Sequence, residues 1–179
     1  MTLEDPIVVN NDPEVLFEGN NWTLKTSLEA IGQADNAFEE KLKEKNGNSE
    51  EIADIWLGFH EALVNSVVHG NLGIIKPDNS TQEISELVEE ELERLKKSDP
   101  EKKRNRKVHM TVKVNKNRIY VKIRDEGEGF KHIEVIDPTN KDNLLKSKGR
   151  GRFLMEKAFN VTYNKKGNEV TLVKNRKNN

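Results

Sequence analysis

Apolar residues recur at helical spacing in two stretches of the first half of the chain. In residues 28–42 the apolar positions lie three or four apart, and the string Asn46-Gly47-Asn48 ends the pattern. In residues 49–69 a second apolar face follows and ends near Gly70. The two faces consist of Leu28, Ile31, Ala34, Phe38 and Leu42, and of Ile52, Ile55, Phe59 and Leu63. The spacing therefore predicts two successive amphipathic helices.

The second half of the chain instead alternates between apolar and polar residues. Residues 108–114 and 119–124 alternate strictly on either side of a short polar turn, which predicts a hairpin of half-buried strands. Residues 161–163 and 169–174 predict a second strand pair, and residues 151–159 predict a helix between the two hairpins. This half is therefore expected to supply most of a sheet.

Residues 1–21 are rich in Asn, Asp and Pro and predict a loosely ordered start, followed by an edge strand at residues 22–26. Together the elements predict a two-layer α+β sandwich, formed by a single domain over residues 22–175. A charged insertion at residues 74–106 interrupts this domain. It comprises a predicted acidic helix at residues 80–93 and a strongly basic stretch after it. The two blocks either stay solvated, close on each other by charge, or meet a partner with complementary patches.

The composition narrows the classes of function. The chain has 179 residues, and its 30 basic and 31 acidic side chains give a formal net charge of -1, which argues against direct binding of nucleic acid through bulk charge. No stretch approaches the roughly 20 consecutive apolar residues of a membrane helix, and residues 1–20 lack the pattern of a secretion signal. We therefore expect a cytoplasmic protein without membrane contact. Cysteine is absent and the four histidines are scattered, so the sequence shows no cluster typical of a metal site.

The first cluster that carries chemistry lies in the second predicted helix. Glu61 and Asn65 are four residues apart, so a helix places the carboxylate and the carboxamide on one face, where both can serve a metal-bound phosphate. The alternative is a solvated pair on an amphipathic helix. The zinc-protease motif is excluded, because Val64 stands where that motif needs a second histidine.

The second cluster directly follows a predicted strand. Gly127 and Gly129 allow main chain to approach a ligand closely, and Asp125 at the strand's end can accept a hydrogen bond from an exocyclic amine. Turn formation alone is the alternative explanation of these glycines. A dinucleotide-binding fingerprint would need a third glycine at the position of His132.

The third cluster, residues 146–155, has a glycine pair at the start of a predicted helix, with basic side chains around it. Backbone amides at a helix N-terminus, together with lysine and arginine side chains, form an anion site that suits a polyphosphate. A flexible basic loop is the alternative. A Walker-type phosphate loop is excluded, because the string Gly-x-x-x-x-Gly-Lys-Ser/Thr is absent.

In this order the clusters resemble the three ATP-binding boxes of the GHKL superfamily of histidine-kinase-like ATPases, which includes type II topoisomerases, heat-shock chaperones, histidine kinases and mismatch-repair ATPases. The motif Glu-x-x-x-Asn ending in His-Gly is most similar to bacterial anti-sigma-factor serine/threonine kinases. Asp125-x-Gly127-x-Gly129-Phe130 resembles the adenine box, Gly149-x-Gly151 the phosphate-side box, and residues 167–170 the entry to the last strand. The resemblance spans residues 22–174. It implies a Bergerat-type ATP-binding fold, with helices on one face of a mixed, mostly antiparallel sheet.

The resemblance also implies a role for each matching residue. Glu61 would be the general base that takes the proton from an acceptor hydroxyl or polarises a water, and Asn65 would ligate Mg²⁺. Asp125 would hold the adenine amino group, and residues 131–148 would form a lid over the bound ATP. The other residues expected near the nucleotide are His69, Gly127, Gly129, Phe130, Lys148, Gly149, Arg150, Gly151, Arg152, Phe153 and Asn168.

Three positions depart from the family pattern. Asn168 replaces a usual threonine near the adenine, Arg152 replaces an apolar residue, and Ser147 between two lysines replaces an arginine before the phosphate-side glycines. Because lysine is a point charge rather than a planar fork, looser phosphate geometry is expected. The insertion at residues 74–106 is also longer than in the simple anti-sigma kinases.

The function that the resemblance implies is a serine/threonine protein kinase that uses Mg-ATP. It would bind a sigma factor or another regulatory protein and phosphorylate its antagonist, and it would thereby regulate transcription. The oligomeric state stays open, although related kinases commonly dimerise. Two other functions also stay open. One is a non-catalytic switch, in which ATP orders the lid and the lid recruits a partner. The other is the catalytic domain of a histidine kinase, in which His60 beside Glu61 accepts the phosphate.

Overall fold

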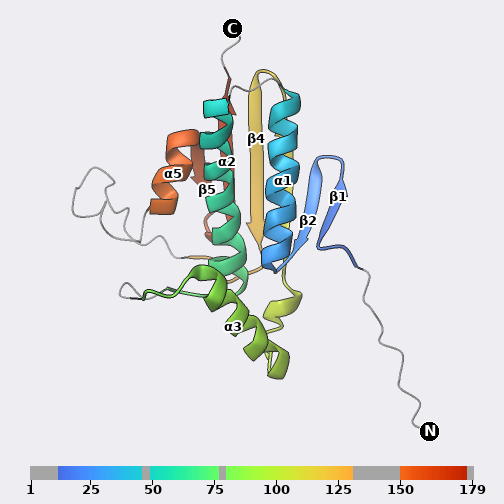
Figure 1. The fold of residues 1–179 in the computed structure, drawn as a ribbon, viewed down its shortest axis with the longest axis vertical. Coiled ribbons are helices and arrows are strands. Elements are labelled where there is room, and N and C mark those ends of the chain that lie inside the picture. The colour runs from blue at the N-terminus through green and yellow to red at the C-terminus, as the bar shows by residue number, and fades with distance from the viewer. Residues whose placement is uncertain (1–11, 46–48, 77–79, 131–149, 177–179) are drawn as a thin grey trace.

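The structure, a computed structural model, describes residues 12–45, 49–76, 80–130 and 150–176. It has two layers, a six-stranded sheet in the order β1-β2-β3-β4-β6-β5 and a layer of helices on one face of it (Figure 1). Each strand pairing in the described residues is antiparallel. The prediction of a two-layer α+β sandwich with a mostly antiparallel sheet is therefore confirmed.

The strands follow the alternation of the sequence. Trp22 pairs with Met110, Met110 with Ile123 and Ile123 with Val170, so that one buried apolar row crosses four strands of the sheet. The neighbouring row, which includes Thr111, faces away from the helices and is polar. The strands are β1 Val15–Glu18, β2 Asn21–Lys25, β3 Lys107–Val114, β4 Arg118–Asp125, β5 Asn160–Tyr163 and β6 Glu169–Asn175.

Helices α1 Leu28–Glu44, α2 Ser49–Val64 and α5 Arg150–Ala158 lie side by side over the apolar face of the sheet (Figure 1). Ser27 caps α1 by accepting a hydrogen bond of 3.1 Å from the backbone N–H of Ala30. The rings of Phe38 in α1 and Phe59 in α2 stack with their centroids 4.0 Å apart, and both side chains are fully buried. This packing fixes the position of α2, which carries Glu61.

The start of the chain differs from its prediction as a loose segment. Val15 pairs with Leu24 and Phe17 with Trp22, so β1 is the edge strand, and the strand predicted for the edge lies one place further in. A tight turn with Gly19 at a φ of 62° joins β1 and β2, a conformation that glycine adopts without strain. Residues 1–11 lie outside the described residues.

The insertion forms helix α3 Ile84–Lys97 and a short 3₁₀ turn, Lys103–Asn105. The helix starts four residues later than predicted and continues into the basic stretch. Its start is set by a capping box between Glu83 and Glu86. It continues because Val88 and Leu95 are buried in a small second core, which Val68 and Leu72 complete. The insertion is therefore packed against residues 68–72, which follow α2, and α3 lies below the main helical layer (Figure 1).

The two charge blocks of the insertion meet within single turns. Arg94 contacts Glu91 and Lys96 contacts Glu93, each three residues apart on α3. Such exposed pairs contribute little stability, about 0–1 kcal/mol each. Among the described residues, no helix combines the length and the apolar character needed to cross a membrane.

Candidate nucleotide-binding site

The helix that carries the first motif changes its winding halfway along. The sequence predicts an α-helix as far as His69, but α2 ends at Val64 and continues as the π-helix η1, Asn65–Asn71. The backbone N–H of Leu72 bonds to the carbonyl of Val67, five residues earlier, at 3.1 Å. In this wider turn the side chain of Asn71 is fully buried, while His69 is exposed. One continuous segment therefore has Glu61 and Asn65 near its middle and Asn71 at its end.

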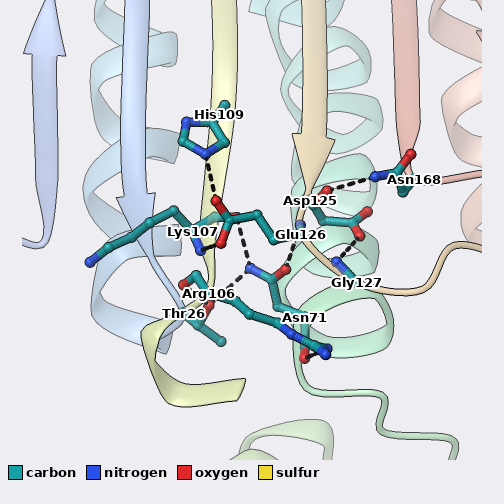
Figure 2. Close-up of polar contacts among 9 residues, drawn as sticks. All are labelled: Thr26, Asn71, Arg106, Lys107, His109, Asp125, Glu126, Gly127 and Asn168. Atoms are coloured by element: carbon teal, nitrogen blue, oxygen red, sulfur yellow. Dashed lines mark hydrogen bonds and ion pairs between the residues drawn. The ribbon is translucent and has the colours of Figure 1, made fainter. Parts of the chain in front are cut away.

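Asp125 is the last residue of β4, and its side chain is buried. The N–H of Gly127 donates to Oδ1 of Asp125 at 2.9 Å, and Asn168 holds the main chain of Asp125 on the other side (Figure 2). Nδ2 of Asn168 donates to the carbonyl of Asp125 at 2.9 Å, and the N–H of Asp125 donates to the carbonyl of Asn168 at 3.0 Å. The bond from Gly127 uses Oδ1, so Oδ2 is the oxygen that can accept a hydrogen bond from a ligand.

Burial raises the pKa of Asp125 to about 6, and the hydrogen bond from the Gly127 N–H offsets part of that rise. Because this pKa is still below 7, the carboxylate is mostly ionised at neutral pH, although water solvates the site poorly. Such a group accepts a hydrogen bond from an amine more strongly than an exposed carboxylate does.

The glycines of the site are required by close contacts between protein segments. A β-carbon on Gly70 would lie 2.5 Å from Cγ of Asp125, and one on Gly127 would lie 2.0 Å from the carbonyl oxygen of Gly70. Gly129 has a φ of 75°, and a β-carbon there would lie 2.1 Å from the carbonyl oxygen of Lys166. The sequence suggests that Gly127 and Gly129 leave room for a ligand. The structure shows the protein's own backbone in that space.

Asn71 is a site residue that no sequence motif indicates. Its Oδ1 accepts a hydrogen bond of 2.8 Å from the N–H of Glu126, and its Nδ2 donates to the hydroxyl of Thr26 at 2.9 Å and to the carbonyl of Lys107 at 3.1 Å (Figure 2). One buried carboxamide thus joins the ends of β2 and β4 to the start of β3. Its position directly after the His69-Gly70 pair is the only sequence signal for it.

Residues of the first and third clusters meet at the start of α5. A β-carbon on Gly151 would lie 2.6 Å from Oε2 of Glu61 and 3.7 Å from Nδ2 of Asn65, so both side chains of the first motif lie against this glycine. Gly151 lies in the first turn of α5, where the backbone N–H groups have no partner within the helix. The structure therefore brings together Glu61, Asn65 and Gly151, which are distant in the sequence.

Several other expected site residues are placed differently or not described. The ring of His69 is exposed, and its Nδ1 donates to the carbonyl of Ile74 at 2.5 Å. Arg152 pairs with Glu156 at 2.6 Å on α5. Phe130 and Phe153 have large exposed fractions, 43% and 44%. Lys148, Gly149 and the predicted lid at residues 131–148 lie outside the described residues, as does the side chain of Arg150.

The chain matches the model of one protein family, described as the histidine kinase-like ATPase domain, over residues 24–174. The match runs from β2 to β6 and contains the helices, the insertion and both ends of the site. The chain therefore belongs to the histidine kinase-like ATPases, a class that binds ATP and acts on its phosphates. No curated protein matches the chain.

The residues present fit both ATP and Mg²⁺. The carboxylate oxygen Oδ2 of Asp125 matches the amino group of adenine, and the carboxamide of Asn65 offers an oxygen of the kind that Mg²⁺ prefers. In the described part of the chain no group of three His, Cys, Asp or Glu side chains could hold a metal ion. An ion bound at Asn65 would therefore take most of its ligands from phosphate oxygens and water.

Proposed function

We propose that this protein is a cytoplasmic serine/threonine protein kinase of the anti-sigma-factor type, which transfers the γ-phosphoryl group of ATP to a regulatory protein. The observation that supports the proposal is the position of Glu61. Its carboxylate lies against Gly151 at the start of α5, one helical turn from Asn65. A site that only bound ATP would not need a partly exposed acid group at the phosphate end.

Asp125 and Asn168 orient the adenine end of the substrate in this proposal. The carboxylate of Asp125 accepts a hydrogen bond from the adenine amino group, while Asn168, the residue before β6, holds the main chain of Asp125. Asn168, the residue that departs from the family pattern, also bonds through Oδ1 to Nδ2 of Asn164 at 2.9 Å. Its carboxamide is therefore used within the protein, and it positions Asp125 rather than the base.

Glu61 acts as the general base in the transfer. The oxygen of the acceptor hydroxyl forms a bond to the γ-phosphorus while the bond from that phosphorus to the bridging oxygen breaks. The electron pair of the broken bond leaves with ADP, and the hydroxyl proton passes to the carboxylate of Glu61. The N–H groups at the start of α5 stabilise the negative charge on the phosphoryl oxygens. Bound Mg²⁺, held by Asn65 and the phosphates, would neutralise further phosphate charge.

The proposal is tested with purified protein, Mg-ATP labelled on the γ-phosphate and a panel of candidate antagonist proteins of sigma regulation. The expected result is phosphoserine or phosphothreonine on one antagonist. ATP binding without transfer to any member would favour the non-catalytic switch. Hydrolysis to ADP and phosphate, with no protein acceptor, would favour a simple ATPase.

The packing of α1 and α2 argues against the histidine-kinase alternative. That alternative would also need α1 and α2 to form a dimerisation hairpin, but Ala30, Phe38 and Phe59 are buried in the core over the sheet. His60 itself is bound to Asp35, with its Nδ1 2.7 Å from Oδ2. Acid-labile phosphate on His60, lost in His60→Ala, would restore the alternative.

A further inference from the structure

Arg106 is the residue at which the insertion returns to the sheet, and it contacts two parts of the adenine side of the site. Its Nη1 donates to the backbone carbonyl of Asn71 at 2.9 Å. Its Nη2 lies 3.8 Å from a carboxylate oxygen of Glu128, which stands between Gly127 and Gly129. The side chain of Arg106 is only 14% exposed, and its carbonyl accepts a hydrogen bond of 2.6 Å from the hydroxyl of Thr26.

Asn71 and Glu126 complete the connection to Asp125. The carboxamide of Asn71 holds the N–H of Glu126, the residue after Asp125 (Figure 2). The carboxylate of Glu126 in turn accepts from the N–H of Lys107 at 3.0 Å and lies 2.9 Å from Nε2 of His109. Asn71 therefore fixes the main chain directly after Asp125, just as Asn168 fixes the main chain of Asp125 itself.

From this geometry we propose that Asn71 and Arg106 form a positioning junction, through which the insertion at residues 74–106 holds loop 125–128 and sets the preference for adenine over guanine. The proposal rests on the proposed binding of adenine at Asp125. Neither residue is placed in contact with the nucleotide. Both act by keeping the carboxylate of Asp125 in one position.

The chemistry of the two bases explains why position decides the preference. Adenine offers an amino group at the place where guanine offers a carbonyl oxygen, and a fixed carboxylate accepts from the first and repels the second. If the loop loosens, the carboxylate can turn away from guanine, and it also loses its aligned bond to adenine. A loose loop therefore weakens the binding of ATP and leaves the weak binding of GTP nearly unchanged.

The same contacts give the insertion a role in regulation. Helix α3 is packed on Val68 and Leu72, next to Asn71 in the same segment, and the chain then returns through Arg106. A protein that binds the insertion and shifts either contact would change the affinity for ATP without touching the nucleotide. Coupling of this kind is reciprocal, so bound ATP would change the affinity for that protein by the same factor.

The test compares Arg106→Gln with Arg104→Gln, a matched control. Arg104 lies two residues earlier, is exposed, and has its side chain 3.8 Å from Asp99 rather than near Asn71. The affinities of each protein for ATP and for GTP are measured by calorimetry, and hydrogen exchange is followed at the amides of Glu126 and Gly127 in nucleotide-free protein. Asn71→Ala is a second variant, used if its unfolding is cooperative.

We expect Arg106→Gln to bind ATP about tenfold more weakly, because the hydrogen bond between the adenine amino group and the charged carboxylate of Asp125 is lost. Its affinity for GTP should stay within about threefold of the parent's. Exchange at Glu126 and Gly127 should become faster by a similar factor, while Arg104→Gln should match the parent. Equal losses for ATP and GTP would indicate a general structural effect and would overturn the inference. An unchanged ratio of the affinities for ATP and GTP, together with unchanged hydrogen exchange at Glu126 and Gly127, would also overturn it. A parent that binds neither nucleotide overturns the proposed function and, with it, the preference claimed here.

Discussion

The carboxylate of Asp125 packs directly against Gly70, so that a β-carbon at position 70 would lie 2.5 Å from Cγ and 2.7 Å from Oδ2 of Asp125. This contact joins the end of the α2 segment to the end of β4. It explains why the first and second motifs belong to one site, although more than fifty residues separate them in the sequence.

Gly70→Ala is therefore expected to displace the carboxylate of Asp125 and to weaken ATP binding by at least about tenfold. The matched control is Gly32→Ala, because Gly32 lies on the exposed side of α1 with no atom within 4 Å of an added β-carbon. The control should bind ATP normally and be more stable by about 0.5–1 kcal/mol, the usual effect of replacing glycine within a helix. Calorimetry with ATP and thermal unfolding measure both effects. A folded Gly70→Ala protein with the parent's affinity would contradict the assigned role of Asp125.

Asp125→Asn is expected to stabilise the nucleotide-free protein at neutral pH. The pKa of Asp125 is about 6 in the folded protein, against an ordinary value of 3.8 that applies to the unfolded chain. The folded protein therefore binds a proton at this carboxyl group more tightly than the unfolded chain does. The contribution of the Asp125 carboxyl group to the free energy of unfolding is fully present below about pH 4. It is lost as the pH rises through about 6, and the total loss is at most about 3 kcal/mol. Asparagine can still accept from the N–H of Gly127 and carries no charge.

Urea unfolding at about pH 5 and about pH 7.5, on either side of the folded pKa, measures this prediction. The parent should lose more stability than Asp125→Asn as the pH rises between these values. Equal pH dependence in the two proteins would show that Asp125 is not buried as described. The same variant should bind ATP poorly, because its amide cannot replace both acceptor oxygens.

The periodicity of the sequence predicts most of the fold, because helical spacing and strand alternation both arise when an element buries one face. Helical spacing predicts α1 and α2, and alternation predicts β3 and β4, because the same residues, such as Phe38 and Ile123, have no exposed surface. Strand β1 is missed because it has only four residues and just one buried side chain, Val15. The end of α3 is missed because charge hides the apolar position Leu95 among basic residues.

The site is predicted only in part, for a different reason. Glu61, Asn65 and Asp125 are recognisable because their motifs have fixed spacing. Asn71 is not, because a polar residue near a helix end is usually solvated, and its three partners come from distant strand ends. The π-helix that turns it inward has no periodic signal of its own, since seven residues are too few to show a new repeat.

Asn65→Ala tests the metal assignment. We expect the affinity for ATP to fall in the presence of Mg²⁺ and to stay near the parent value in EDTA, because Asn65 is assigned to the metal and not to the nucleotide. The matched control is Asn36→Ala, at an exposed position of α1. Titrations with a fluorescent ATP analogue, with and without Mg²⁺, give both affinities. An equal loss under the two conditions would assign Asn65 to direct nucleotide contact.

The claim that Glu61 is the general base of a phosphoryl transfer is tested by Glu61→Gln. The control is Glu40→Gln, the same substitution at an exposed site of α1. Both variants are assayed for ATP affinity and for single-turnover transfer to the protein acceptor. Glu61→Gln should bind ATP within about twofold of the parent and transfer phosphate at least about a hundredfold more slowly, because a general base acts in the transition state. Transfer at the parent's rate with normal ATP binding would contradict the claim.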